Sequence, residues 1–241
     1  TYGAEYSTNR LDDQVKAYNI RTQQNVSTIG MYVQSEWTSR YLNLLIGARM
    51  DKHNLLSSPV LVPRLSLLYK YNDSWQVRAS YSSGYRAPQA YDEDFHITQV
   101  GGMSLRTKLA DNLNAEYSNS FSLSSDYYAF LGKNWQANLL IEGFYTILND
   151  VFATRIIEQD TINNIIYQER YNASGADVAG VSLSAKLAYK DLVTFSLGYT
   201  LQTSKYKQTE YWSDDESVEG TDYLLRSPED YGFFSMDISA I

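Results

Sequence analysis

The chain of 241 residues contains no cysteine and only two histidines, four prolines and four methionines. Without cysteine there is no disulfide framework, no thiolate metal site and no thiol nucleophile. No run of 18 or more apolar residues occurs, which excludes a transmembrane helix. The 20 basic and 28 acidic residues give a net charge of −8, so no basic excess is available to neutralise phosphates. These absences argue against a disulfide-stapled domain, a helical membrane protein and a nucleic-acid binder.

Helical periodicity is also nearly absent, and strand-like alternation of apolar and polar residues takes its place. Residues 135–145 (WQANLLIEGFY) are typical, because every second side chain from Trp135 to Tyr145 falls on one face. The pattern predicts an all-β antiparallel meander. Its strands are expected at about ten segments: 1–7, 25–37, 41–51, 62–71, 75–83, 115–130, 134–150, 179–190, 193–205 and 229–240.

The connections between these segments are of two kinds that alternate along the chain. Tight turns are predicted at residues 38–40, 72–74, 131–133 and 191–192. Long loops are predicted at residues 8–24, 52–61, 84–114, 151–178 and 206–228, with residues 151–178 forming a hairpin that extends the wall. Neighbouring strands of a meander are antiparallel, so every tight turn lies at one end and every long loop at the other. Outer-membrane barrels sort their connections in this way.

Aromatic residues make up 14% of the chain and gather near the two ends of the predicted strands. One set flanks the tight turns: Trp37, Tyr41, Tyr69, Tyr71, Trp75, Tyr127, Tyr128, Phe130, Trp135, Tyr189 and Phe195. A second set lies near the long loops: Tyr81, Tyr117, Tyr145 and Tyr199. Ten steps of strand span ~33 Å, or ~25 Å of vertical height at a ~40° tilt, which is the height of the apolar band on a membrane barrel. The two sets therefore predict two interfacial girdles.

Between the girdles, one predicted face is apolar and the other is polar. The apolar face carries no charge, and its members include Ile29, Met31, Val33, Leu44, Ile46, Leu65, Leu67, Phe121, Leu123, Leu139, Ile141, Val181, Leu183 and Leu197. The polar face carries serine, threonine, amide and charged side chains. A large soluble sheet with one solvated face is the alternative, and it explains the alternation but neither the girdles nor the sorted loops. We therefore expect lipid to cover the apolar face.

Several segments, in their order along the chain, resemble the barrel of a TonB-dependent outer-membrane receptor. The most specific are residues 62–70 (VPRLSLLYK) and 75–88 (WQVRASYSSGYRAP), because the family pairs a strand of this first type with one ending in Gly-(Phe/Tyr)-Arg-Ala-Pro. Residues 47–54 (GARMDKHN), 114–121 (NAEYSNSF), 180–183 (GVSL) and 225–231 (LRSPEDY) also look like family segments.

The resemblance implies that residues 1–241 are a segment of a barrel with a plugged lumen and about 22 strands, of which ten are present. The signal peptide, plug domain and terminal strand are expected elsewhere in the full-length chain. The implied function is a receptor in the outer membrane of a Gram-negative cell. Its outer loops capture a scarce nutrient of the iron–siderophore, haem or cobalamin class, and TonB energises import. The implied partners are the lipid bilayer, the plug, the TonB complex and a small nutrient ligand, without a cofactor or resident metal.

Two other functions remain open from the residues alone. A complete small outer-membrane barrel acting as an omptin-like protease needs His53 or His96 as its base. A passive porin needs a chain without a plug. If the protein is a receptor, we expect it not to be an enzyme.

Candidate ligand-binding residues follow the most specific strand and lie in the last long loop. Outer-loop side chains that can meet an imported ligand are Arg86, Tyr91, Asp92, Glu93, Asp94, His96, Tyr211 and Trp212. The alternative for the acidic run is a solvated loop, and a calcium site at Asp92 and Asp94 is a further alternative. Tyr211 and Trp212, with Tyr206, either stack on a flat or sugar-like ligand or pack between loops.

The polar face supplies a second group of candidates: Arg49, Arg64, Arg78 and Glu142. The three arginines are expected to face the lumen and contact the plug or an anionic substrate. Pairing with Glu36, Asp126 or Glu142 is the alternative for these arginines. His53 beside Asp51 is most simply a strand end entering solvent.

Overall fold

A computed structural model describes residues 1–15, 20–88, 104–162, 165–211, 219–224 and 227–239. Every regular element in this part is a β-strand, and it holds no helix long and apolar enough to cross a membrane. The strands are β1 (Tyr2–Val15), β2 (Ile20–Thr38), β3 (Leu42–His53), β4 (Val60–Lys70), β5 (Trp75–Arg86), β6 (Ser104–Leu109), β7 (Glu116–Leu131), β8 (Trp135–Asn149), β9 (Phe152–Asp160), β10 (Ile165–Asn172), β11 (Ala176–Tyr189), β12 (Val193–Glu210), β13 (Thr221–Tyr223) and β14 (Asp230–Ile238).

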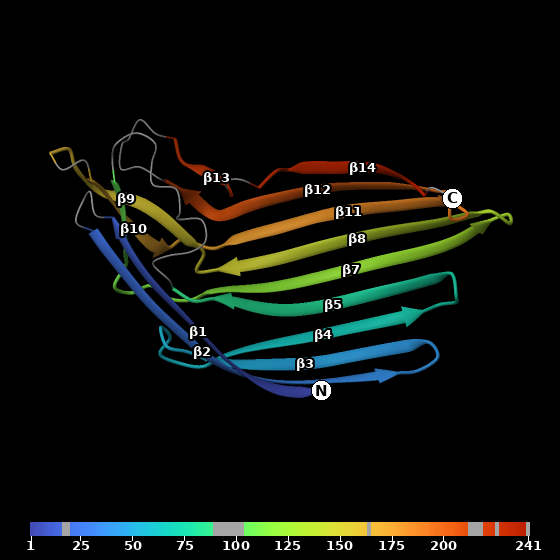
Figure 1. Cartoon of the computed structure of the whole chain (residues 1–241), viewed down its shortest axis with the longest axis horizontal. Helices are drawn as coiled ribbons and strands as arrows, with labels where there is room; N and C mark the ends of the chain where they lie inside the picture. Colours follow the sequence, from blue (N-terminus) through green and yellow to red (C-terminus); the bar gives the residue numbers. More distant parts are fainter. Residues whose placement is uncertain (16–19, 89–103, 163–164, 212–218, 225–226, 240–241) are drawn as a thin grey trace.

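Eleven strands form one antiparallel sheet in the order β1-β2-β3-β4-β5-β7-β8-β11-β12, with both β13 and β14 paired to β12. Figure 1 shows these strands side by side, with tight turns gathered at one end and longer connections at the other. All ten predicted strand segments are present, and the predicted tight turns are correct to within about a residue. The all-β antiparallel meander is confirmed.

The register confirms the two predicted faces strand by strand. One cross-strand row on the apolar face joins eight strands: Trp37, Leu44, Leu67, Ala79, Leu123, Gly143, Val181 and Leu201. The row starts next to a tight turn on β2, whereas on β12 it lies in the middle of the strand, eight residues from the start at Val193. Hydrogen-bonded rows that climb in this way are the stagger that a closed, tilted barrel requires.

No second layer covers the apolar face in the described part of the chain. Its side chains at Ile29, Met31, Val33, Leu123 and Val181 are between 53% and 60% exposed. Exposed apolar area on this scale, spread over a whole sheet, is unusual for a monomeric protein in water. The face therefore needs an apolar environment from outside these strands.

The loop ends of several strands are longer than the alternation predicts, which corrects the expected loops at residues 8–24 and 206–228. β1 and β2 form one long hairpin that continues to Val15 and Ile20, and β12 continues to Glu210. These extensions are polar on both faces, for example STNRLDD at residues 7–13. Beyond an apolar band, both faces of a hairpin meet water, so the ladder continues without the apolar period that marks a strand.

A second sheet of three strands lies at the loop end and has the order β6-β10-β9. The hairpin predicted within residues 151–178 is present as β9 and β10, but its strands belong to this small sheet and not to the wall itself. β6 was expected as part of a loop, and it pairs parallel to β10. The parallel pairing joins the connection between β5 and β7 to the connection between β8 and β11.

Candidate functional site

The three arginines predicted to line the polar face are brought to one hollow. Its volume is about 690 Å³, and β2, β3, β4 and β5 supply its walls, with Arg49, Arg64 and Arg78 among the lining residues. Every second residue of these strands points to this face, so serines alternate with the arginines: Ser66, Ser80 and Ser82. The hollow presents a cationic, hydroxyl-rich surface.

Arg49 is held by two carboxylates at the loop end of the hollow. Its Nε donates to Asp51 Oδ1 at 2.8 Å, and its Nη1 donates to Glu5 Oε2 at 2.9 Å. Glu5, Gly30 and Asp51 form one cross-strand row, and the guanidinium spans it over the glycine. A Cβ at Gly30 would collide with both Arg49 and Asp51, so only glycine leaves room for this bridge.

Asp51 is the buried centre of that cluster. It is 5% exposed, and its Oδ2 also accepts a hydrogen bond of 3.2 Å from the Tyr85 hydroxyl. The neighbouring His53 is buried too, and its Nδ1 accepts a hydrogen bond from Leu55 N, so it is not the solvent-facing strand end that we expected. The carboxylate of Asp51 is engaged by Arg49 and Tyr85, and the imidazole of His53 is engaged by its own loop.

Arg64 and Arg78 differ from Arg49, because both are exposed and neither forms an ion pair with a described residue. Gly47, directly opposite Arg64, leaves the space that its side-chain stem occupies. The alternative pairing of the arginines with Glu36, Asp126 or Glu142 does not occur in the described part. Asp126 instead accepts hydrogen bonds from Gln76 and Asn138, while Glu142 lies across Ser124 from Arg78 in one row.

At the loop end, Arg86 lies where β5 meets the β9–β10 hairpin. Its guanidinium carbon is 5.3 Å from the centroid of the Phe152 ring, and that of Arg170 is 5.6 Å from the same ring. Glu116, opposite Arg86 in the register, accepts a hydrogen bond of 2.9 Å from Phe152 N. Arg86 therefore forms part of the contact that fastens the hairpin to the wall.

A second fastening contact centres on Glu210 at the loop end of β12. Its Oε1 accepts 3.2 Å hydrogen bonds from both Ser174 N and Ser174 Oγ, and its Oε2 accepts one of 3.1 Å from the Tyr171 hydroxyl. Burial, and then the Glu210 charge, raise the pKa of Tyr171 to about 12. Residues Glu116, Phe152 and Glu210 were not predicted as functional, because the contacts join segments about 36 residues apart and leave no local signal.

The other predicted ligand-binding residues divide into one that is described and a group that is not. Tyr211 follows β12 and is 58% exposed. Tyr91, Asp92, Glu93, Asp94, His96 and Trp212 lie outside the described residues. Among the residues that the structure does describe, no three His, Asp or Glu side chains gather as metal ligands would.

Comparison with known proteins places this architecture. A family profile described as "TonB dependent receptor-like, beta-barrel" matches residues 1–237. No curated protein sequence matches the chain.

Several solved structures share the fold at low sequence identity. A mutant of the ferric enterobactin receptor PfeA from Pseudomonas aeruginosa superposes with a TM-score of 0.68 at 16% identity, over 100% of this chain and 36% of that one. The siderophore receptor PirA from Acinetobacter baumannii gives 0.67 at 16%, over 99% and 37%. The FrpB iron transporter from Neisseria meningitidis (F3-3 variant) gives 0.63 at 17%, over 98% and 39%. The chain thus spans well under half the length of these proteins.

Proposed function

The chain belongs to the family of TonB-dependent receptor-like β-barrels, and from that premise we propose that it is part of the barrel wall of an outer-membrane nutrient receptor. In this proposal residues 1–241 are one segment of the barrel domain. The plug and the remaining strands are supplied by the rest of the full-length chain. The observation that carries the proposal is the family match together with an apolar face that no described element covers.

The environment of the apolar face supports a location in the outer membrane of a Gram-negative cell. Contact between the apolar side chains and lipid hydrocarbon tails has no desolvation cost. Exposure of the same side chains to water would be unfavourable. Aromatic rings lie at both ends of the apolar face. Near the tight turns the ring centroids of Trp135 and Tyr189 are 4.8 Å apart, and near the loops those of Tyr81 and Phe121 are 5.0 Å apart. Amphipathic rings favour the two interfaces of a bilayer.

The outer loops are the proposed capture site. The side chains that would meet a ligand there are Arg86, Tyr91, Asp92, Glu93, Asp94, His96, Tyr211 and Trp212. The β6-β10-β9 sheet gives this end a scaffold, because it joins two loops that are separate in the sequence. A ferric siderophore is the ligand class we favour over haem and cobalamin, since structural neighbours are named as siderophore or iron transporters. TonB would supply the energy for import, and no catalysis is part of the proposal.

The arginine hollow is the proposed contact for the plug. Arg64 and Arg78 form no ion pair with a described residue. An acidic surface of the plug, or an anionic substrate in the lumen, would form ion pairs with their guanidinium groups. Replacing both by glutamine in the full-length receptor should weaken import and leave surface binding intact. Lys133→Gln in a tight turn is the matched control, because it also removes a positive charge but lies far from the hollow.

The deciding experiment is uptake of ligands that carry a radioactive metal, iron in the siderophores and haem and cobalt in cobalamin, by a Gram-negative strain that expresses the full-length receptor as its only receptor for these ligands. With a panel of ferric siderophores, haem and cobalamin, one ligand should be bound tightly and imported. Import should stop in a TonB-null strain while surface binding persists. Uptake that is indifferent to TonB would identify a passive porin, and cleavage of a peptide panel would identify a protease; either result overturns the proposal.

A further inference from the structure

His53 ends β3 in a buried position, and its imidazole is bonded into the loop that follows. The residue is 3% exposed, and its Nδ1 accepts a hydrogen bond of 3.1 Å from Leu55 N. The carbonyl oxygen of His53 accepts a second bond of 3.1 Å from Leu56 N. On the other side, His53 pairs with Thr28 at the end of the β2–β3 ladder. The imidazole therefore joins the end of the wall to the loop at residues 54–59.

The bond from Leu55 N depends on the protonation state of the ring. A neutral imidazole has one nitrogen that can accept a hydrogen bond, whereas both nitrogens of a protonated imidazole are donors. A ring that accepts at Nδ1 is therefore neutral and carries its proton on Nε2. If His53 took up a second proton, two N–H groups would face each other at this contact.

The other described bonds of the loop come from groups of a different kind. Asn54 Oδ1 accepts from Ser27 N at 3.0 Å, and Asn54 Nδ2 donates to Asn25 O at 2.9 Å. Lys52, whose charge on the outward face places this end of β3 beyond the apolar band, donates to two backbone oxygens of the loop. Residues 54–59 (NLLSSP) contain no ionisable side chain. Among these residue types, histidine alone changes charge between about pH 5 and pH 8, so mild acid acts on the loop through the imidazole.

Charged and titratable groups from three strands meet beside the imidazole. Asp51 lies two residues back on the same strand face and accepts hydrogen bonds from Arg49 and from Tyr85 of β5, while Arg49 also pairs with Glu5 of β1. Burial lowers the pKa of His53 below its usual 6.5, and the negative charge of Asp51 opposes this only in part. A lowered imidazole pKa stabilises the docked loop above the unfolded value of 6.5, and that effect is lost as the pH falls below it.

We propose that the neutral imidazole of His53 is a proton-sensitive latch on the β3–β4 loop, and that mildly acid pH releases this loop at the mouth of the lumen. Protonation removes the acceptor for Leu55 N and places a positive charge in a buried site. Both changes favour a loop that is detached and hydrated. The inference goes beyond nutrient import, because it concerns the regulation of an outer loop. It takes from the proposed function only that this end of the sheet faces outward.

The test measures the mobility of a spin label at Ser58→Cys, in the exposed part of the loop, in the full-length receptor in detergent and without other cysteines. The ratio of mobile to immobile label should rise as the pH falls from about 7.5 to about 5. The rise should reach at most about tenfold for each pH unit below 6.5, because release takes up one proton. His53→Gln stays neutral at every pH and should abolish the response. His53→Ala has no acceptor and should leave the label mobile over the whole range.

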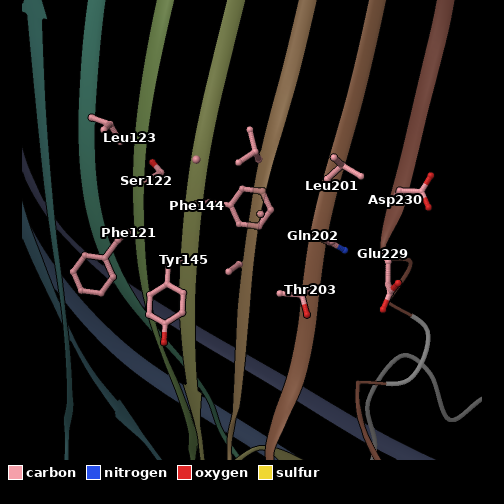
Figure 2. A pocket seen from close by; sticks show the side chains of 14 residues that line it. Phe121, Ser122, Leu123, Phe144, Tyr145, Leu201, Gln202, Thr203, Glu229 and Asp230 are labelled. Carbon is pink, nitrogen blue, oxygen red and sulfur yellow. The ribbon is translucent and has the colours of Figure 1, made fainter.

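A second label, at Thr203→Cys, controls for a general effect of acid on the barrel. Thr203 is exposed on β12, which lies far along the sheet from β3 (Figure 1). Figure 2 shows Thr203 beside a groove of about 910 Å³ that crosses β7, β8, β11 and β12. None of the described residues that line this groove is a histidine. The control label should therefore be equally mobile at both pH values.

Two results overturn the inference. One is a label at position 58 that is as immobile at acid pH as at neutral pH when His53 is present. The other is a pH response that persists in His53→Gln or His53→Ala, in whichever variant is shown to be folded by its heat-resistant migration on gels. The proposed function is judged separately by uptake. Absence of uptake by the wild type at neutral pH overturns that function and leaves the latch as it stands, whereas a loop indifferent to pH overturns the latch and leaves uptake as it was.

Discussion

At the scale of single residues, three glycines on the polar face each lie beneath an aromatic ring from the opposite strand. The pairs are Gly3 with Tyr32, Gly180 with Phe144 and Gly198 with Phe233, and each is a direct cross-strand pair. Glycine weakens a strand because it has no side chain to pack. A ring laid across the glycine restores the contact that the missing side chain would have made.

Gly180→Ala should therefore destabilise the barrel by about 1–3 kcal/mol, the usual cost of overfilling a packed site. Its Cβ would come within 2.5 Å of Phe144 Cζ and 2.6 Å of Leu201 O, and the backbone oxygen cannot move aside. Gly143→Ala, in open space on the next strand, should leave stability unchanged or raise it slightly. The urea midpoint of the refolded receptor in detergent measures both, and equal midpoints would contradict the contact.

Asp51→Asn should cost more than Tyr85→Phe, because the two changes remove different parts of one cluster. The first removes the charge that faces Arg49 in a buried position and should cost about 1–3 kcal/mol, while the second removes one hydrogen bond at about 0.5–1.5 kcal/mol. The same urea titration checks the order. Tyr85→Phe costing as much as Asp51→Asn would show that the charge contributes nothing.

At the scale of elements, the sequence predicts what lies within the apolar band and misses what lies beyond it. The alternation of apolar and polar residues located β3, β4, β7, β8 and β11 and assigned their two faces. It could do so because successive side chains in these strands point in turn to the apolar face and to the polar face. It missed the tips of β1, β2 and β12, where both faces are polar, and it also missed the short strand β6. The parallel pairing of β6 with β10 joins residues some 60 positions apart, and such a contact has no periodic signature in one sequence.

Glu210→Gln should loosen the β9–β10 hairpin without unfolding the wall. The carboxylate joins β12 to Ser174 and Tyr171, and a neutral amide replaces two strong acceptors by one weaker acceptor. Hydrogen exchange of the full-length receptor should show faster exchange in residues 165–174, and unchanged exchange in β8 and β11. Glu158→Gln, an exposed residue on the same hairpin, is the matched control. Equal hydrogen-exchange rates in the two variants would show that Glu210 does not hold the hairpin to the wall.

The projecting tip of the β1–β2 hairpin should depend on acid pH. Arg21 donates to Asp12 through Nε at 2.8 Å and Nη2 at 2.7 Å, and this contact lowers the pKa of Asp12 to about 2. A depressed carboxyl pKa stabilises the folded tip above its unfolded value of 3.8 and loses that effect as the pH falls toward 2. Spin labels placed across the tip should report widening as the pH falls from about 4 to about 2. Asp12→Asn should show the wide form at every pH, and a pH-independent wild type would exclude the ion pair.

At the scale of the whole molecule, the proposed location in a membrane depends on which face of the sheet is apolar. The side on which each residue falls could be predicted from the sequence, because a register error of one residue would place Arg49, Arg64 and Arg78 among the apolar rows. The ionic partners of those three arginines could not be predicted from the sequence. Arg49 is engaged by Glu5, 44 positions away, while Arg64 and Arg78 lack an ionic partner in the described part.

Two neighbouring residues at mid-height of β8 test the orientation of the whole wall. Ile141, on the apolar face, is 45% exposed and lies between Ser125 and Leu183, whereas Leu140 faces the other side and lies between Asp126 and Ser184. Ile141→Arg should cost about 2–4 kcal/mol, the penalty for a charged side chain facing the middle of a bilayer. Leu140→Arg should cost far less, because its guanidinium enters a polar lumen beside Asp126. Folding titrations of the full-length receptor in lipid vesicles measure the difference. Since the two changes are chemically the same, equal penalties would mean that the apolar rows do not face hydrocarbon, whereas a penalty confined to Ile141→Arg places lipid on that side of the sheet.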